Sequence, residues 1–284
     1  MISAPLISVV IATRDRRESL TRCLDALAAS GAGFAPGWQA IVVDNGSRDG
    51  TAQFLAERRL RNDLPLEVIV EDRPGLSFAR NAGLARARGE IIAFTDDDCL
   101  VEPDWLTRLA AAYRETDAAD AIGGWVGLHD PADLPVSIRI SPYEVWITDC
   151  VHALAQLIGC NFSARAAALG RVGMFDPRLG AGSTAQSAED LDLFHRMLRL
   201  GLRLRYDPTI RVLHAHGRRD PGALRRLQEG YVIGRGAFYA KHILAGDRRI
   251  LLQSAREIAE LARRGPRRLL KPLLRGAWLR VNGR

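Results

Sequence analysis

Three consecutive aspartates, Asp96-Asp97-Asp98, come directly after an apolar stretch of the chain. Three adjacent carboxylates repel one another, so a compensating positive charge is expected beside them. Mg²⁺ and Mn²⁺ prefer oxygen ligands and are commonly shared between one or two carboxylates and substrate phosphates. Because alternate residues of an extended stretch point the same way, we expect Asp96 and Asp98 to share a face. The triplet therefore predicts a divalent-cation site, with a solvated acidic loop as the alternative.

Four further charged residues lie at positions where they could bind a ligand or take part in catalysis. Asp44 ends an apolar stretch, although an Asp-Asn-Gly sequence also forms turns unaided. Arg80 falls within a predicted helix, where an arginine can pair with phosphate, pair with a buried carboxylate or stay solvated. Glu189 and Asp190 begin another predicted helix, where acids can serve catalysis or simply complement the helix dipole. The residues alone leave each of these alternatives open.

The elements that must position these residues alternate between strand and helix in the first half. Strands are expected over residues 7–12, 41–44, 66–71 and 90–95, and helices over residues 17–29, 50–61, 77–88 and 103–113. Four such units in series predict a parallel sheet with right-handed crossovers and covering helices. In such sheets ligands bind beyond the carboxyl ends of the strands, which is where Thr13, Asp44 and the aspartate triplet fall.

The second half is less regular. It predicts strands over residues 122–128, 159–163, 202–206 and 209–214, and one helix over residues 188–200. The fold class is therefore α/β: a Rossmann-like, mostly parallel central sheet flanked by helices, followed by a mixed half and a helical C-terminal tail.

The charge of the chain is concentrated at one end. Residues 248–284 contain 11 Lys or Arg and two Asp or Glu, a net charge of +9, whereas the whole chain has +7. The other 247 residues therefore carry −2, which removes the main support for nucleic-acid binding. The basic tail could lie on an anionic membrane as an amphipathic helix, broken at Gly265-Pro266 and Lys271-Pro272. A helical appendage packed on the domain is the alternative.

Cysteine usage and hydropathy bear on the compartment. The four cysteines, Cys23, Cys99, Cys150 and Cys160, show no paired metal-ligand spacing and are expected to be reduced thiols of a cytosolic protein. No basic region precedes the apolar residues 6–12 and no small-residue cleavage site follows, so no signal peptide is expected. No apolar run approaches the roughly 18 residues that span a bilayer. We expect a cytoplasmic protein, with contact to the inner face of the cell membrane as an option.

Four ordered motifs resemble those of family 2 glycosyltransferases, which have the GT-A fold. They are Ser8-Val-Val-Ile-Ala-Thr-Arg-Asp-Arg16, Val42-Val-Asp-Asn-Gly-Ser-Arg-Asp-Gly-Thr51, Gly75-Leu-Ser-Phe-Ala-Arg-Asn-Ala-Gly83 and Gly89-Glu-Ile-Ile-Ala-Phe-Thr-Asp-Asp-Asp98. The resemblance extends over about residues 5–217. It implies an inverting reaction, in which an acceptor oxygen attacks the anomeric carbon while the nucleoside diphosphate departs.

The resemblance also implies how the first half binds a nucleoside diphosphate sugar. Thr13 and Asp44 would contact the base and ribose, and Arg80 would lie near the nucleotide. Many relatives have a tyrosine where this chain has Arg14, so an aromatic partner for the base is missing and the arginine could stack on it instead.

Mn²⁺ or Mg²⁺ is the implied cofactor. Asp98 would be the principal metal ligand, Asp96 would contact the ribose or the metal, and Asp97 is counted with the substrate-binding residues. A histidine at the position of His214 or His216 serves some relatives as a further metal ligand through its neutral imidazole. Of the two we choose His214, with ordinary strand-end histidines as the alternative.

The motif Ala188-Glu-Asp-Leu-Asp-Leu193 resembles the acidic pair of the family, in which the aspartate is the usual base. We assign Asp190 as the base, with Glu189 beside it in the catalytic pair. A base must lie within hydrogen-bond reach of the attacking hydroxyl. It must also stand apart from the metal, because a metal-bound carboxylate is too weakly basic.

These assignments divide the chain into a nucleotide-sugar-binding half (1–120), an acceptor-binding half (121–220) and a basic helical tail (221–284). The expected acceptor is a glycan or glycolipid, in polysaccharide, glycolipid or other glycoconjugate synthesis. One rival is a nucleotidyltransferase, which would show a glycine-rich phosphate loop after strand one, whereas residues 13–17 contain no glycine. The other rival is a non-catalytic nucleotide-sugar-binding module, which would not need the carboxylates that this chain retains.

Overall fold

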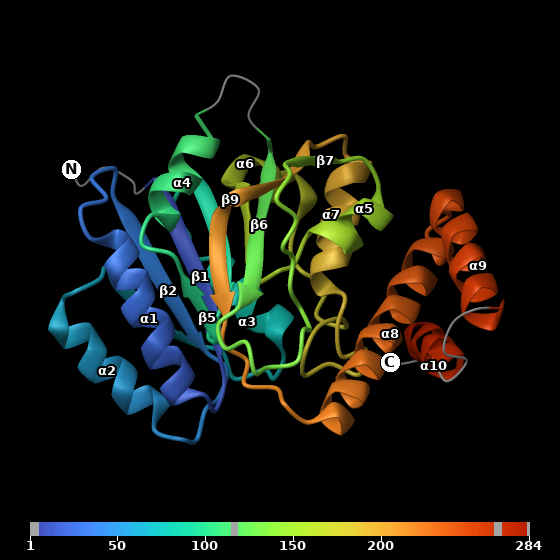
Figure 1. Cartoon of the computed structure of the whole chain (residues 1–284), viewed down its shortest axis with the longest axis horizontal. Helices are drawn as coiled ribbons and strands as arrows, with labels where there is room; N and C mark the ends of the chain where they lie inside the picture. Colours follow the sequence, from blue (N-terminus) through green and yellow to red (C-terminus); the bar gives the residue numbers. More distant parts are fainter. Residues whose placement is uncertain (1–5, 115–118, 264–268, 283–284) are drawn as a thin grey trace.

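The computed structural model describes residues 6–114, 119–263 and 269–282. These residues form a nine-stranded sheet with the strand order β3-β2-β1-β4-β8-β6-β9-β5, and β7 pairs with β9 beside this path. Helices cover both faces of the sheet, and the last three helices stand together beyond one of its ends (Figure 1). The α/β fold class predicted from the sequence is confirmed.

The strands are β1 (Ile7–Thr13), β2 (Trp38–Asp44), β3 (Leu66–Val70), β4 (Ile91–Asp96), β5 (Cys99–Val101), β6 (Ala121–Leu128), β7 (Val145–Ile147), β8 (Asn161–Arg165) and β9 (Leu204–His214). The helices are α1 (Arg17–Gly31), α2 (Thr51–Arg61), α3 (Leu76–Leu84), α4 (Trp105–Ala112), α5 (Cys150–Gln156), α6 (Ala166–Val172), α7 (Glu189–Arg199), α8 (Pro221–Leu244), α9 (Arg248–Arg263) and α10 (Leu270–Asn282).

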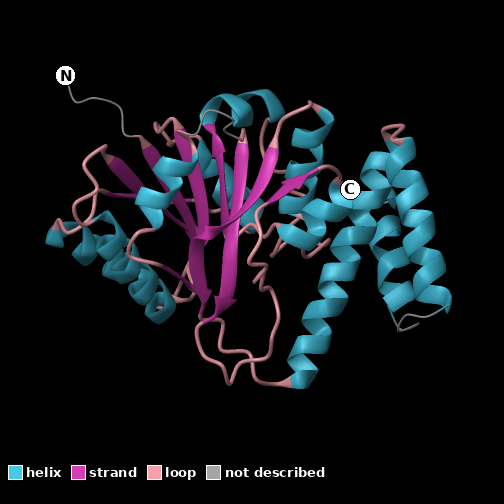
Figure 2. Ribbon diagram, turned by 45° about the horizontal axis from the view of Figure 1, so that its top comes forward, coloured by secondary structure: helices cyan, strands magenta, loops and turns pink. Residues whose placement is uncertain are grey.

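The first four strands are mutually parallel, as the strand–helix alternation predicts. In β1, Val9 and Ile11 pack in the core layer of α1, α2 and α4, whereas Val10 packs in the layer of α3, α5, α6 and α7. Because side chains of a strand alternate between the two faces, β1 must be apolar on both. Figure 2 shows the helices on either side of the sheet. Because β1 and β4 are parallel neighbours, their carboxyl ends lie side by side.

The second half adds antiparallel pairings to this parallel sheet. β8 pairs antiparallel with both β4 and β6, and β9 runs parallel to β6. The two strands predicted over residues 202–206 and 209–214 are wrong, because they form the single strand β9. Its pairing with β6 shifts register between Gly124 and Trp125, which leaves Pro208 outside the ladder. A proline lacks the amide proton and is tolerated at such an irregularity without ending the strand.

Several other boundaries differ from the sequence-based ones. The helix predicted over residues 77–88 ends at Leu84, because the chain then turns so that the amides of Arg88 and Gly89 donate to the Ser8 hydroxyl at 3.1 and 2.8 Å. The short elements β5, β7, α5 and α6 were not predicted. Of these, α5 has a local signal, since the Asp149 carboxylate accepts from the amides of Val151 and His152 as an N-cap.

The C-terminal tail consists of separate packed helices. α10 crosses α8 at glycines, where a Cβ at Gly236 or Gly276 would overlap the backbone of the other helix. The predicted break at Lys271-Pro272 is wrong, because Pro272 lies in the first turn of α10, where proline is tolerated. The predicted break at Gly265-Pro266 lies outside the described residues. Among the residues that the structure describes, no helix is both long and apolar enough to cross a bilayer.

Candidate active site

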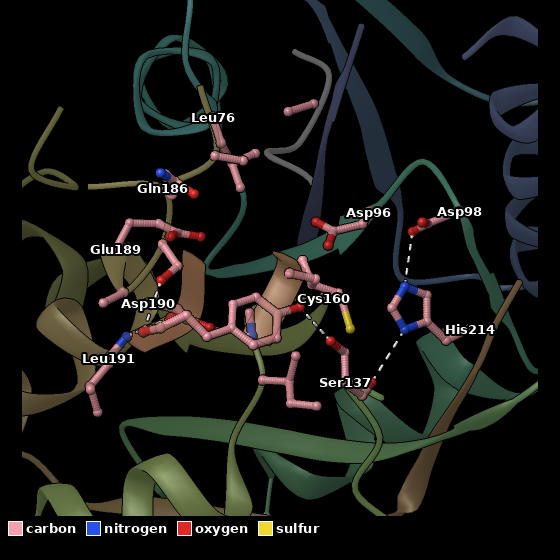
Figure 3. A pocket seen from close by; sticks show the side chains of 18 of the residues that line it. Leu76, Asp96, Asp98, Ser137, Cys160, Gln186, Glu189, Asp190, Leu191 and His214 are labelled. Atoms are coloured by element: carbon pink, nitrogen blue, oxygen red, sulfur yellow. Dashed lines mark hydrogen bonds and ion pairs between the residues drawn. The ribbon is translucent and has the colours of Figure 1, made fainter. Parts of the chain in front are cut away.

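A cavity of about 860 Å³ opens at the carboxyl ends of β1 and β4. Its other walls come from the starts of α3 and α7, residues 135–139, α5, the loop before β8, the end of β9 and the first half of α8. It brings together almost all residues predicted from the sequence. They are Thr13, Arg14, Arg80, Asp96, Asp97, Asp98, Glu189, Asp190 and His214. Figure 3 shows Glu189 and Asp190 facing Asp96 and Asp98 across this space.

The aspartate triplet is not extended, contrary to the sequence-based argument. β4 ends at Asp96, and Asp97 and Asp98 form a turn into β5. Alternation therefore does not govern these side chains: Asp96 faces Arg80, whereas Asp98 faces His214. The expectation that Asp96 and Asp98 share one face of a strand is wrong, although both line the cavity.

Arg16, which was not predicted, holds the turn. Its Nη1 lies 2.9 Å from Asp97 Oδ1 and its Nη2 lies 3.0 Å from Asp98 Oδ2. The Thr13 hydroxyl donates to Asp97 Oδ2 at 2.8 Å. Burial raises the pKa of Asp97 to about 7, against the charge of Arg16. Asp97 is only 4% exposed, and the structure shows it in contact with Thr13 and Arg16. It therefore holds the Thr13 side chain beside the turn.

Asp98 and His214 bring a carboxylate and an imidazole to one point. His214 Nε2 lies 3.2 Å from Asp98 Oδ1, while its Nδ1 lies 3.2 Å from the Ser137 carbonyl oxygen. Burial opposes both charges, but their mutual attraction wins: the pKa of Asp98 falls well below its usual range and the pKa of His214 rises to about 9. A ring held through Nδ1 by a carbonyl is the usual support for a metal-binding Nε2.

Cys99 completes this cluster, since donor atoms of Asp98, Cys99 and His214 lie within 4.8 Å of one another. Burial raises the pKa of the Cys99 thiol well above its usual value, so it stays protonated and is a poor ligand for a hard cation. His216 turns instead toward Asp133, with Nδ1 3.6 Å from Oδ2. The donor set therefore fits one oxygen and one nitrogen ligand to a cation such as Mn²⁺, from Asp98 and His214.

Arg80 joins the two halves of the site. Its Nη2 lies 2.9 Å from Asp96 Oδ1 and its Nη1 lies 2.9 Å from Glu189 Oε1. Arg80 is 3% exposed and Glu189 is 6% exposed. Burial, together with the neighbouring Asp190, raises the pKa of Glu189. Of the alternatives left open for Arg80, the structure selects pairing with carboxylates, of which Glu189 is buried and Asp96 is half-buried.

Asp190 differs from the other carboxylates of the cavity. Its Oδ2 accepts from the Gly159 amide at 3.0 Å and its Oδ1 accepts from the Leu191 amide at 2.7 Å. Asp96 and Glu189 pair with Arg80, and Asp97 and Asp98 pair with Arg16. In the described part of the chain, no cationic side chain lies within ion-pair distance of Asp190. A half-buried carboxylate held only by amides is free to accept a proton from a ligand.

Two residues predicted to bind the sugar donor, Asp44 and Arg14, do not lie among the residues at the centre of the cavity. Asp44 does not line the cavity: its Oδ1 accepts from the Ser47 amide at 2.9 Å, which is the turn role left open above. Asn45, which was not predicted, does line it. The Asn45 amide group bridges the Glu71 carbonyl, at 2.7 Å, and the Gly75 amide, at 2.8 Å. Arg14 has an exposed side chain at the cavity edge.

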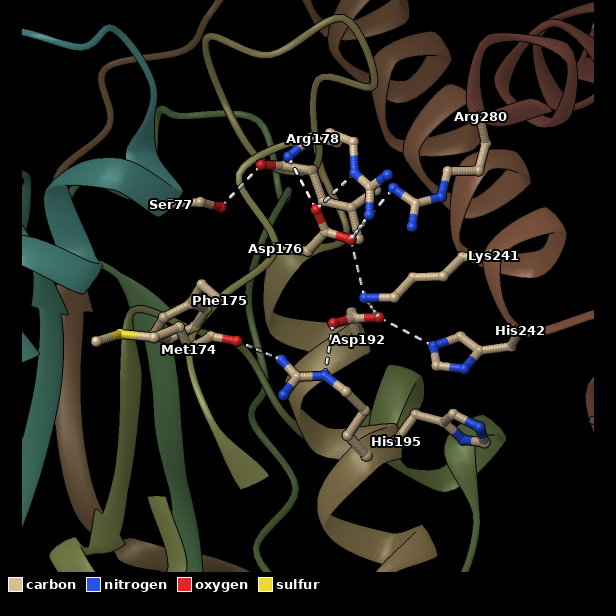
Figure 4. A network of polar contacts seen from close by, with 12 residues as sticks. Ser77, Met174, Phe175, Asp176, Arg178, Asp192, His195, Lys241, His242 and Arg280 are labelled. Atoms are coloured by element: carbon tan, nitrogen blue, oxygen red, sulfur yellow. Dashed lines mark hydrogen bonds and ion pairs between the residues drawn. The ribbon is translucent and has the colours of Figure 1, made fainter. Parts of the chain in front are cut away.

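A buried polar network holds the far side of α7 (Figure 4). Asp192 is fully buried and contacts Lys241 Nζ at 2.6 Å, His242 Nε2 at 2.9 Å and Arg196 Nε at 2.8 Å. Lys241 also reaches Asp176, at 3.0 Å. Since Asp192 is two residues from Asp190, α8 fixes the helix that carries the acidic pair. The only sequence signal was the second aspartate of the Ala188–Leu193 motif.

Comparisons with known proteins agree with this geometry. A sequence model of glycosyl transferase family 2 matches residues 8–154, more than half of the chain. The glycosyltransferase AglE of Haloferax volcanii is 34% identical over 121 residues, 42% of this chain and 39% of AglE. The pre-mycofactocin glycosyltransferase of Mycobacterium tuberculosis is 28% identical, over 82% of this chain and 46% of its own. The chain thus spans less than half the length of these two relatives.

Solved structures support the fold. A mannosyltransferase of Pyrobaculum calidifontis, in complex with GDP-Man and Mn²⁺, aligns over 100% of this chain and 77% of its own, with a TM-score of 0.65 and 19% identity. TarS of S. aureus aligns over 82% of this chain and 39% of its own, with a TM-score of 0.62 and 21% identity. With the matched model and the GT-A fold, the chain belongs to glycosyl transferase family 2.

Proposed function

We propose that the protein is an inverting glycosyltransferase that moves a sugar from a nucleoside diphosphate sugar to an acceptor hydroxyl. The observation that carries this proposal is the division of the cavity carboxylates. Asp98 converges with His214 on one side, and Asp190, without a cationic partner among the described residues, faces it from the other. Such a division suits a reaction that needs a leaving-group site and a separate base.

The donor is assigned to the half formed by residues 1–120. Thr13, Arg14 and Asn45 line the cavity at the ends of β1 and β2, and Asp44 would act by holding the turn that presents Asn45. Asp98 and His214 would hold Mn²⁺ or Mg²⁺, which when bound offsets the charge on the departing diphosphate as a Lewis acid. A mannosyltransferase of similar fold was solved with GDP-Man and Mn²⁺, which supports this assignment.

The acceptor is assigned to the half formed by residues 121–220. The acceptor oxygen forms a bond to the anomeric carbon, the bond from that carbon to the diphosphate oxygen breaks, and the acceptor proton passes to Asp190. Arg80 keeps Asp96 and Glu189 in place through its two ion pairs. The acceptor would be a glycan or glycolipid, in polysaccharide, glycolipid or other glycoconjugate synthesis.

The basic tail is proposed to touch an anionic membrane. α9 and α10 expose large apolar side chains, including Leu252 at 62%, Leu274 at 59% and Trp278 at 60%. Arginines accompany them on the same helices, which suits a negatively charged lipid surface. The test is sedimentation with vesicles that contain anionic lipid: L274S/W278S should bind less than the parent protein, and equal binding would end the idea.

The function is tested by incubating the protein with a panel of nucleoside diphosphate sugars and Mn²⁺ and measuring released nucleoside diphosphate. We expect release from one donor class, and a loss of release in D190N with nucleotide binding kept. D104N, at an exposed carboxylate directly before α4, is the matched control. Nucleotide binding without turnover of any donor would favour a non-catalytic module, and pyrophosphate release from a nucleoside triphosphate would favour a nucleotidyltransferase.

A further inference from the structure

The direction of the His214 ring depends on a short segment that lines the cavity. His214 Nε2 faces Asp98, and His214 Nδ1 lies 3.2 Å from the Ser137 carbonyl oxygen (Figure 3). A metal-binding imidazole keeps its tautomer and its ring direction through the partner of its second nitrogen. The position of the Ser137 carbonyl therefore decides how well Nε2 points to the place where Asp98 would hold a cation.

The segment that carries Ser137 is anchored to the sheet region at its two ends. The Leu134 amide donates to the Arg218 carbonyl at 2.8 Å, and Arg139 exchanges two backbone hydrogen bonds of 2.7 Å with β6. Between these anchors, residues 135–138 make no backbone–backbone hydrogen bond within the described part of the chain. The direction of the Ser137 carbonyl is thus not fixed by the sheet and needs another support.

The backbone of Ser137 is itself unusual. Its φ is +53°, in the left-handed region that favours glycine over a residue with a side chain. The neighbouring Val136 is buried, but apolar burial has no direction and does not orient a carbonyl. The Ser137 hydroxyl, in contrast, forms a hydrogen bond of 2.6 Å with the Tyr231 hydroxyl of α8. A serine at this position therefore offers a carbonyl to His214 and a hydroxyl through which α8 holds it.

α8 is a firm support for Tyr231. The Ser187 hydroxyl donates to the Gly230 carbonyl at 3.1 Å, and a Cβ at Gly234 would overlap Ser187, so the helix lies directly against the loop before α7. Farther along α8, two contacts with the buried Asp192 hold this helix against α7. The Tyr231 hydroxyl is therefore presented by a helix that is fixed on both sides of it.

Tyr231 also lies within the active site. It lines the cavity and is 37% exposed. Burial raises the pKa of Tyr231, so its hydroxyl keeps its proton at neutral pH and can both donate and accept. The charges of Arg218 and Asp190 act on Tyr231, which places it near both the cation side and the base side of the cavity. A contact at this hydroxyl can therefore act on the residues that surround a bound donor.

We infer that Tyr231 is a positioning residue of the metal site: its hydroxyl holds Ser137, and the Ser137 carbonyl in turn directs His214 Nε2 toward the cation. The cation at Asp98 and His214 belongs to the proposed function, on which this inference rests. α8 then supports both sides of the active site, since it fixes the helix of the base through Asp192 and the metal ligand through Tyr231.

The test uses the full chain and Mn²⁺ alone, with binding measured by calorimetry. Y231F removes one oxygen atom and should weaken Mn²⁺ binding by about two- to tenfold, as expected for the loss of one hydrogen bond. S137A removes the other hydroxyl of the same bond and should cause a similar loss. The double variant Y231F/S137A should lose no more than either one. Y143F, at a tyrosine that is 75% exposed, is the control and should bind like the parent protein.

A second comparison separates a positioning role from general damage to the protein. In H214Q the imidazole is absent, so H214Q/Y231F should bind Mn²⁺ as H214Q does. A structural defect caused by Y231F would instead lower the affinity equally in both backgrounds. The electron paramagnetic resonance spectrum of bound Mn²⁺, which reports the geometry of its ligands, should differ between Y231F and the parent protein but not between Y143F and the parent protein.

Three outcomes would overturn the inference alone: Mn²⁺ binding by Y231F as tight as by the parent protein, an equal loss in the parent and H214Q backgrounds, or a resonance spectrum that Y231F leaves unchanged. In each of these the parent protein still binds Mn²⁺. A parent protein that does not bind Mn²⁺ would instead overturn the assignment of Asp98 and His214 in the proposed function, and this inference with it.

Discussion

The aspartates after β4 and the acids at the start of α7 face one cavity but are held in different ways. Asp97 and Asp98 are fixed by Arg16 within a tight turn at the end of a parallel strand. Asp190 is held by backbone amides, while Asp192, on the other side of the same helix, is fixed by Lys241 and His242 of α8. In the proposed function the same residue type thus has three roles, cation binding, proton transfer and structural support, according to which groups the fold places beside it.

The largest effect on activity is expected at Asp190. D190N keeps the shape of the side chain but cannot accept the acceptor proton, so the rate of sugar transfer should fall by about 10²–10⁴. Mn²⁺-dependent nucleotide binding should be unchanged, because Asp190 contacts the Gly159 and Leu191 amides rather than the triplet. Transfer measured at saturating donor checks this, with D104N as the control. Full activity in D190N would show that Asp190 is not the base.

On the other side of the same helix, D192N should act on stability. Lys241, His242 and Arg196 would lose a fully buried carboxylate, and breaking a buried ion pair costs about 3–5 kcal/mol in the free energy of unfolding. Urea unfolding followed by circular dichroism measures the loss. A D192N protein as stable as the parent, with reduced transfer alone, would place Asp192 in the chemistry instead.

Substitutions of Asp98 and His214 should affect metal-dependent nucleotide binding rather than acceptor binding. Removal of the cation with EDTA, or D98N, should weaken nucleotide binding by roughly a hundredfold, since a cation contributes several kcal/mol to holding a diphosphate. H214Q should weaken Mn²⁺ binding, whereas H216Q should not, because His216 faces Asp133. Isothermal titration with Mn²⁺ and a nucleoside diphosphate compares the parent protein with D98N, H214Q and H216Q. Equal losses in H214Q and H216Q would contradict the assignment of His214.

The smallest predicted effect is on the acid sensitivity of the α7–α8 contact. Burial opposes ionisation, but His242, Arg196 and Lys241 lower the pKa of Asp192 to about 2, against about 3.9 in an unfolded chain. The resulting stabilisation, about 3 kcal/mol, is present above a pH of about 4 and is lost as the pH falls toward 2. The free energy of unfolding of D192N should therefore change less with pH over this window. Parallel pH curves for the two proteins would argue against the contact.

The sequence predicted those parts of the site whose signals are local. Thr13, Asp96 and His214 each end a strand, and the strands β1 to β4 carry enough apolar residues to define the sheet. Arg16 was missed because its partners are 81 and 82 residues away, in the triplet. Arg139 lies in an irregular stretch, so no periodicity pointed to its place in the cavity. The turn at Asp97 was missed because three adjacent acids give no signal for where a strand ends.

Mn²⁺-dependent binding of nucleoside diphosphates to the parent protein, D98N and D190N, measured by calorimetry alongside sugar transfer, tests the division of roles most directly. The account predicts that D98N loses nucleotide binding, whereas D190N binds as the parent protein does and fails to transfer the sugar. Normal nucleotide binding by D98N, or normal transfer by D190N, would contradict it.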